Sequence, residues 1–191
     1  MEFPQGEKNA YTLREEDAVK KYREDLLQEI QEAGDNEVVY ADLGGVTLGS
    51  SCIDETIVPA LKEIRRSLLD KSKSRRYMVV RDPAGRSDWD ADAALRKASE
   101  ETGSKLIAVW RTDQQVELIG PVDEQVRSTY EFLQERPGHE ATTREMADAY
   151  DITIQAANNR MNRAVKAGIV RKISRKSVQG GGTQNVYVSV E

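Results

Sequence analysis

The sequence predicts an N-terminal α/β domain with helices packed on a sheet, followed by a smaller α+β C-terminal domain. Short apolar segments typical of strands alternate with longer segments of helical periodicity across residues 15–120, which is the pattern of a sheet covered by helices. Pro121 ends this alternation, and three helical segments and a hairpin follow over residues 122–191. Residues 1–14 show no periodicity, so we expect a flexible arm there.

Each N-terminal element follows from its own pattern. Apolar residues recur at helical spacing over residues 15–33, 52–70 and 89–102. Gly34 and Gly103 stand where the first and third of these helices should end. Short apolar runs predict strands over residues 37–43, 76–81, 105–111 and 115–120, with Val46 to Leu48 leading into a turn at residues 49–51.

Composition and length narrow the class of protein. The 191 residues are 38% hydrophobic and 32% charged, which fits a globular protein with a well-solvated surface. No segment approaches the roughly 20 apolar residues of a membrane span, and the first residues lack the basic and apolar parts of a secretory signal. A single cysteine, Cys52, excludes an internal disulfide. We therefore expect a cytoplasmic protein without a membrane contact.

Charge is distributed unevenly along the chain. The net charge of −5 would by itself argue against a nucleic-acid partner. Residues 152–190, however, carry seven Lys and Arg and no Asp or Glu. A positive segment in an acidic chain is typical of a surface that meets phosphates. An ordinary basic face is the alternative interpretation.

The C-terminal helices have well-defined start and stop signals. After a helix over residues 122–135, Thr142 to Glu145 match the capping box that begins a helix, here one ending at Tyr150. Residues 151–153 form a turn, and Thr153 is a suitable N-cap for a further helix. That helix should end at Ala167, because Gly168 follows it in the position of a left-handed cap.

The last of these helices is amphipathic in an unusual way. Its predicted apolar face holds Ile154, Ala157, Met161, Ala164 and Val165. Its other face holds Asn, Gln, Arg and Lys without any carboxylate, and the first three types can pair with base edges in the major groove. Two strands, 169–174 and 185–190, follow it and are joined by a basic loop over residues 175–184 that suits a phosphate backbone.

This part of the chain resembles the winged helix-turn-helix regulators of the multiple-antibiotic-resistance type, through residues 143–150 and 155–170. The resemblance implies a DNA-binding domain over residues 122–191, in which the helix after Thr153 enters the groove and the hairpin touches phosphates. It also implies a homodimer on two half-sites. The expected DNA contacts are Thr143, Arg144, Gln155, Asn159, Arg160, Asn162, Arg163, Lys166, Arg175 and Lys176. A winged helix that binds protein is the alternative.

Residues 42–55 resemble the STAS domain, the anti-anti-sigma factor fold, and especially its STAS-like branch. The resemblance implies a STAS-like α/β domain over residues 15–120 that senses a signal or docks on a kinase-like ATPase. Regulatory members are phosphorylated on a serine in the turn before a helix, which is the position of Ser51. Where that family has an acidic residue before the serine, this chain has Ser50. Ser50 and Ser51 are thus either a phosphorylation or anion site or plain helix caps.

Other reactive side chains form no pattern of chemistry. Cys52 near a helix start could sense redox state, but a small buried residue is the simpler interpretation. His139 lies in a loop without a second His or Cys near it. Asp82, Asp88, Asp90 and Asp92 fit a capped helix start better than a cation site. We therefore predict no catalytic residues, no metal and no cofactor.

Two functions are compatible with these observations. The first is a transcriptional regulator that binds double-stranded DNA through the C-terminal domain and carries a STAS-like sensing or docking domain. The second is a protein-interaction switch, in which the STAS-like domain docks on an ATPase or kinase partner and the winged helix contacts protein. An enzyme is disfavoured, because no catalytic constellation is present.

Overall fold

The computed structural model describes residues 10–11, 16–44, 46–70, 72–85, 87–177 and 183–191. Its fold is α/β with a central mixed sheet of four strands in the order β2-β4-β5-β6. These strands are β2 (Glu37–Asp42), β4 (Arg76–Arg81), β5 (Ala108–Arg111) and β6 (Val116–Ile119). The first two neighbouring pairs are parallel, and β5 and β6 are antiparallel.

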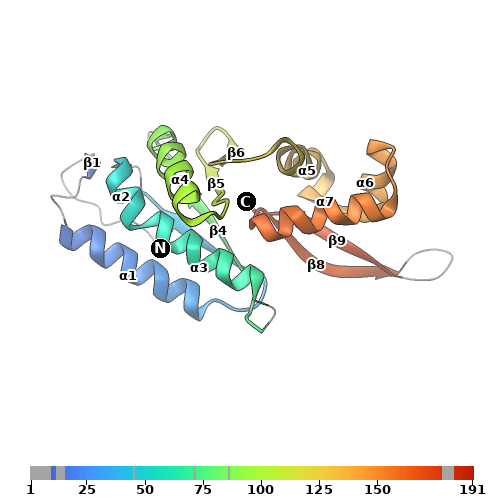
Figure 1. The fold of residues 1–191 in the computed structure, drawn as a ribbon, viewed down its shortest axis with the longest axis horizontal. Coiled ribbons are helices and arrows are strands. Elements are labelled where there is room, and N and C mark those ends of the chain that lie inside the picture. Colours follow the sequence, from blue (N-terminus) through green and yellow to red (C-terminus); the bar gives the residue numbers. More distant parts are fainter. Residues whose placement is uncertain (1–9, 12–15, 45, 71, 86, 178–182) are drawn as a thin grey trace.

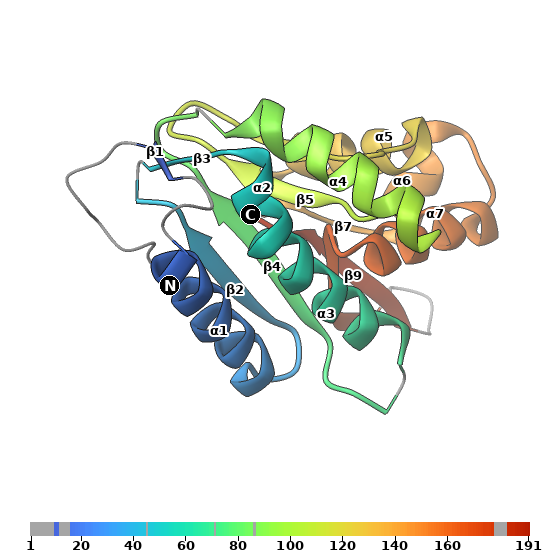
Figure 2. The same cartoon turned by 60° about the vertical axis from the view of Figure 1, so that its left-hand side comes forward.

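Four helices in the described ranges cover one face of the sheet (Figure 2), and the last three connect its parallel strands. They are α1 (Glu16–Glu32), α2 (Ser50–Glu55), α3 (Ile57–Leu69) and α4 (Asp88–Thr102). A short parallel pair, β1 (Ala10–Tyr11) with β3 (Thr47–Leu48), lies beside them. Part of the segment predicted as a flexible arm is therefore a strand. The rest of residues 1–14 lies outside the described residues.

The C-terminal part begins with α5 (Glu124–Gln134) and a short 3-10 turn, η2 (Pro137–His139). Two helices follow, α6 (Thr143–Tyr150) and α7 (Ile154–Ala167). A three-stranded antiparallel sheet in the order β7-β9-β8 completes it, built from β7 (Glu140–Thr142), β8 (Val170–Ser177) and β9 (Thr183–Ser189). Figure 1 shows these elements beside the sheet, with the β8–β9 hairpin extending away from it.

The two faces of the central sheet are both buried, against different partners. Because side chains alternate along a strand, Met78 and Val80 of β4 pack with α1, α3 and α4, whereas Tyr77 and Val79 point to the opposite side. That opposite side is covered by the C-terminal elements, through side chains such as Tyr130 of α5. Two hydrophobic cores therefore lie on the two faces of the sheet, and the second is shared between the N-terminal strands and the C-terminal elements.

Backbone carbonyls at the chain end strengthen this contact. The hydroxyl of Tyr130 donates to the Val190 carbonyl at 2.8 Å, and that of Tyr40 donates to the Glu191 carbonyl at 3.1 Å. Burial raises the pKa of the Tyr130 hydroxyl. Among the described residues, no helix combines the length and apolarity that a bilayer crossing needs.

The structure differs from the sequence-based expectations at three points. The helix predicted over residues 52–70 is two helices, because Thr56 interrupts it and its hydroxyl donates to the Cys52 carbonyl at 2.6 Å. β7 was not predicted, since its three residues are too few to show alternation. Ile154 was placed on the apolar face of its helix, yet its side chain is half exposed at the first turn of α7.

Candidate nucleic-acid interface

The capping predictions for α6 and α7 are confirmed. Thr142 is the N-cap of α6 and forms the full capping box with Glu145. The Thr153 hydroxyl accepts from the Ala156 backbone N–H at 3.1 Å and so begins α7. Gly168 ends α7 in the left-handed conformation with φ of 83°. Both ends of α7 are therefore fixed by the sequence itself.

One face of α7 packs into the core and holds the helix in place. Ala157, Met161, Ala164 and Val165 are buried against the other C-terminal elements. At the edge of this face, Asn158 accepts a hydrogen bond of 3.2 Å from the hydroxyl of Tyr187 on β9. The helix is thus anchored on one side only, and its opposite side is left to solvent.

That opposite side presents an exposed stripe, defined here as Gln155, Asn159, Asn162 and Lys166. Their spacing of four, three and four residues puts them in one row along the helix. Gln155 Nε2 donates to Asn159 Oδ1 at 3.1 Å, which orients two neighbouring amides of the stripe. The stripe offers amide donors and acceptors along its length and a positive charge at its carboxyl end.

Arg163 lies on the flank of the stripe and has partners on α5. Its guanidinium donates to Asp123 Oδ2 at 2.9 Å and to Gln125 Oε1 at 3.1 Å. Asp123 is the N-cap of α5, accepting from the Val126 N–H at 3.1 Å, and it also pairs with Lys105 at 3.2 Å. Arg163 therefore faces α5, although half of its side chain remains accessible.

The pKa of Asp123 reflects this position. Partial burial raises it, but hydrogen bonds from Val126 and Lys105 and the positive charges of Arg163 and Lys105 lower it, and the net shift is downward. Neither Asp123 nor Gln125 was a candidate from the sequence. Asp123 could have been found as an N-cap one residue before the helix, but its contact with Arg163 is tertiary and leaves no local signal.

The remaining predicted DNA contacts whose side chains the structure describes, Arg160 of α7 and Thr143 and Arg144 of α6, differ in how exposed they are. The Arg160 guanidinium lies 5.0 Å from the ring centre of Tyr150 and is half-buried there. Arg144 is exposed on α6. Thr143, a predicted DNA contact, is 6% exposed and hydrogen-bonded to Tyr187. The structure thus puts Thr143 in the interior and leaves Arg144 on the surface.

The hairpin after α7 is longer than predicted. Arg175 and Lys176 belong to β8, where their backbones pair with Asn185 and Gln184 of β9. Their side chains lie outside what the structure describes, as does the connection over residues 178–182. Their expected role as phosphate contacts stays a prediction.

Ser50 and Ser51 are the first two residues of α2, and no side chain caps this helix. Gly49 is the N-cap, and α2 begins at Ser50, which is exposed, while Ser51 is half-buried. Cys52 is fully buried, as the simpler interpretation expected. Side-chain capping is therefore not seen at α2, and a phosphorylation or anion site at Ser50 and Ser51 stays a prediction.

The acidic residues near α4 serve local structure. Asp82 is fully buried and accepts from the backbone N–H groups of Gly85 and Ser87 and from Trp110 Nε1, at 3.2, 3.0 and 3.3 Å. Asp92 pairs with Arg96 at 2.6 Å. In the part of the chain that the structure describes, no three His, Cys, Asp or Glu side chains gather as metal ligands.

Two further polar residues have structural partners. The Ser87 hydroxyl accepts from the Leu48 N–H at 2.9 Å, so this side chain ties α4 to β3 instead of capping α4. His139 contacts the Gln134 carbonyl through Nδ1 at 2.9 Å and lies 3.7 Å from the Glu191 carboxylate through Nε2.

Comparison of the chain with protein-family models, with curated proteins and with solved structures found no match.

Proposed function

We propose that this protein binds double-stranded DNA in a sequence-dependent manner and regulates transcription. In this proposal residues 122–191 act as a winged helix-turn-helix domain, α7 is the helix that enters the major groove, and the β8–β9 hairpin is the wing. The observation that carries the proposal is the exposed stripe, Gln155, Asn159, Asn162 and Lys166, on a helix anchored only by its other face.

The chemistry of the stripe supports DNA more than it supports solubility alone. Amide side chains can pair with adenine, and Lys can pair with guanine or a phosphate. No carboxylate occurs between residues 152 and 190 to repel the phosphates. Arg144 on α6 and Arg163 on α7 are both exposed, so both are accessible enough to meet the DNA backbone.

The N-terminal part would act as the STAS-like sensing or docking unit in this proposal. It is joined to α7 through the shared core and not only through a linker, since α5 and α7 pack on the second face of the central sheet. A change in the sheet or in α3 would therefore be felt at α7. We propose a homodimer on two half-sites, as most such regulators need to read a palindrome.

Selection of genomic DNA with the purified full chain, followed by sequencing, tests the proposal. Wild-type protein should retain fragments that share a sequence, and Asn159→Ala should retain DNA with that sequence preference lost. Arg163→Glu with Lys166→Glu should abolish retention at moderate salt. Lys20→Glu with Lys21→Glu makes the same change of charge on exposed residues of α1 and should retain DNA normally. Unchanged retention by the α7 double variant would reject the assignment.

One observation favours the second candidate function, docking on a protein partner. Trp89 at the start of α4 is 85% exposed, and exposed tryptophans are frequent anchors of protein interfaces. The neighbouring α2 carries Ser50 and Ser51 and is tied to α4 by the Lys97–Asp54 pair at 3.4 Å. Crosslinking in cell extract should then recover an ATPase or kinase with wild type and lose it with Trp89→Ala.

A further inference from the structure

A pocket of about 420 Å³ lies at the carboxyl end of α3, next to the segment that follows α4. Its walls come from Lys62 to Asp70 on one side and from Thr102 to Leu106 on the other. The volume falls within the range of pockets that hold small organic molecules. Its lining is separate from the exposed stripe of α7, and only the carboxyl end of that helix comes near it.

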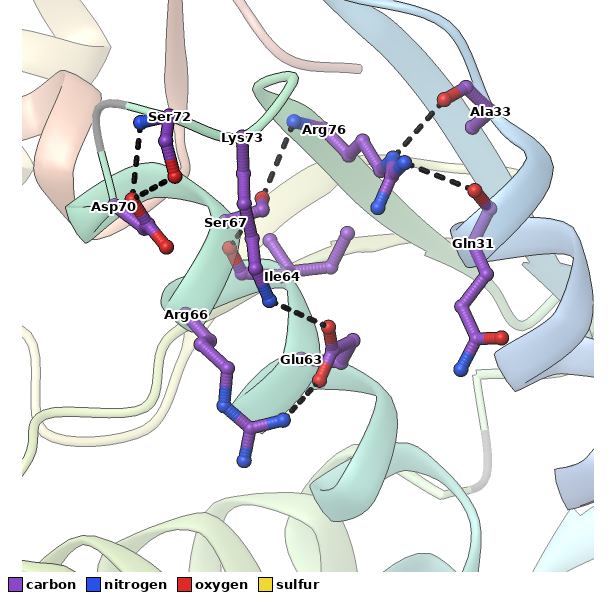
Figure 3. A network of polar contacts seen from close by, with 10 residues as sticks. All are labelled: Gln31, Ala33, Glu63, Ile64, Arg66, Ser67, Asp70, Ser72, Lys73 and Arg76. Carbon is purple, nitrogen blue, oxygen red and sulfur yellow. Dashed lines mark hydrogen bonds and ion pairs between the residues drawn. The ribbon is translucent and has the colours of Figure 1, made fainter.

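The polar part of the lining is mainly positive. Lys62, Arg65 and Arg66 all contribute, against one carboxylate, Asp70. Asp70 Oδ1 accepts from the backbone N–H and the hydroxyl of Ser72 at 2.9 and 2.7 Å (Figure 3). These hydrogen bonds, the largest cause, lower the pKa of Asp70.

Glu63 lies next to the pocket and balances part of the positive charge. Figure 3 shows Arg66 and Lys73 both directed at its carboxylate, so one acid serves two cations. Arg66 nevertheless keeps 66% of its side chain exposed. The pocket therefore has an excess of positive charge that an anion could neutralise.

Arg65 is the cation set deepest in the wall. One of its terminal nitrogens donates to the Lys166 carbonyl at the end of α7 at 3.0 Å. Its Nε is buried and has no hydrogen-bond partner among the residues that the structure describes. Burial lowers the pKa of this guanidinium, because the charged form is desolvated.

The rest of the lining is apolar. Leu69 is one of the few large hydrophobic side chains exposed to solvent, at 55%. Leu106, across the pocket, is almost fully buried and presents a carbon surface there. A ligand that matched this pocket would thus carry an apolar body between the two leucines and an anionic group toward the arginines.

We propose that this pocket binds a small organic carboxylate with an apolar chain, held by Lys62, Arg65 and Arg66 at its head and by Leu69 and Leu106 along its body. A carboxylate suits the planar guanidinium fork better than a point-like anion does. Ligand binding here does not require DNA binding, since no residue of α7 lines the pocket.

Isothermal titration of the full chain with sodium octanoate tests the proposal directly. We expect octanoate to bind, and 1-octanol and inorganic phosphate each to bind at least about tenfold more weakly, a difference of about 1.4 kcal/mol. Octanol lacks the charge and phosphate lacks the chain, so the pair separates the two halves of the site. Phosphate binding as tight as octanoate, or no octanoate binding at all, would overturn the proposal.

Variants locate the binding. Lys62→Glu with Arg66→Glu should weaken octanoate binding by at least about tenfold; both side chains are exposed, so the fold should be kept. Lys20→Glu with Lys21→Glu is the matched control on α1 and should bind as wild type does. Amide NMR shifts on adding octanoate should concentrate at Leu69 and Ser104. Equal weakening by both double variants, or shifts elsewhere, would show that the pocket is not the site.

Discussion

The Arg163 guanidinium on α7 donates to the Asp123 carboxylate that caps α5, at 2.9 Å. The same carboxylate holds Lys105, just before β5, at 3.2 Å. Asp123 thus ties together the beginning of α5, the segment before a central strand and the flank of the helix proposed to enter DNA. While this pair is made, Arg163 points to protein and not to a phosphate.

Replacing Asp123 by Asn should raise DNA affinity. Asn is as good an N-cap as Asp, so α5 should be kept while Arg163 is released. Because exposed ion pairs contribute at most about 1 kcal/mol, we expect a gain of up to about fivefold. Fluorescence anisotropy with a selected DNA fragment measures it. Asp148→Asn removes the same charge from α6, and an equal gain there would mean that charge alone is responsible.

The lowered pKa of Asp123 predicts an acid-dependent loss of stability. A carboxyl whose pKa is lower in the folded state than its ordinary 3.8 stabilises the fold above that value. This contribution is lost as the pH falls through the folded pKa. In urea unfolding, the free energy of unfolding of wild type should therefore exceed that of Asp123→Asn by a constant amount near neutral pH. This difference should shrink as the pH falls below 3.8. A difference that grows toward acid pH would contradict the contact network.

Gly168→Ala should destabilise the fold by more than left-handed strain alone. At φ of +83° an added Cβ would also lie 3.3 Å from Leu68 Cδ1 of α3. Gly103 has φ of +63°, and a Cβ added there would meet no atom of the described residues within 4 Å. Gly103→Ala should cost about 1 kcal/mol, and Gly168→Ala clearly more, in guanidinium unfolding. Equal costs would mean that α3 and α7 are not in close contact.

Asp82→Ala should be among the most destabilising substitutions of a polar residue in this chain. It would leave the Ser87 backbone N–H and the buried Trp110 Nε1 without their acceptor, whereas the Gly85 N–H would keep its bond to the Asp82 backbone carbonyl. We expect a loss of about 3 kcal/mol, measured by chemical unfolding followed by circular dichroism. Glu100→Ala, on the exposed side of the same α4, is the control and should change stability by less than about 0.5 kcal/mol.

The local elements were largely predictable, because their signals are local. The capping box at Thr142, the cap at Thr153 and the left-handed glycines at 103 and 168 all lie where the sequence places them. The interruption at Thr56 was missed, since the apolar spacing runs on through it and only the hydroxyl contact with the Cys52 carbonyl marks the break.

The arrangement of these elements was less accessible from the sequence. Residues Tyr77 to Val80 of β4 are all buried, so their pattern indicates burial on both faces without saying what covers each. Likewise, periodicity predicted which side of α7 is exposed, whereas the pairing of Arg163 with Asp123 joins residues forty positions apart. Thr143 was misplaced as a surface residue for the same reason, because its partner Tyr187 is distant in the chain.

The central sheet, packed on both faces, also limits how the two halves of the chain can move relative to each other. A regulator whose halves hang on a linker can respond by swinging one half relative to the other. Here Tyr77 and Val79 are packed beneath α5 and α7, so such a swing would expose the middle of the protein to water. If the proposed regulatory function holds, a signal from the first half would have to reach α7 through these tightly packed side chains.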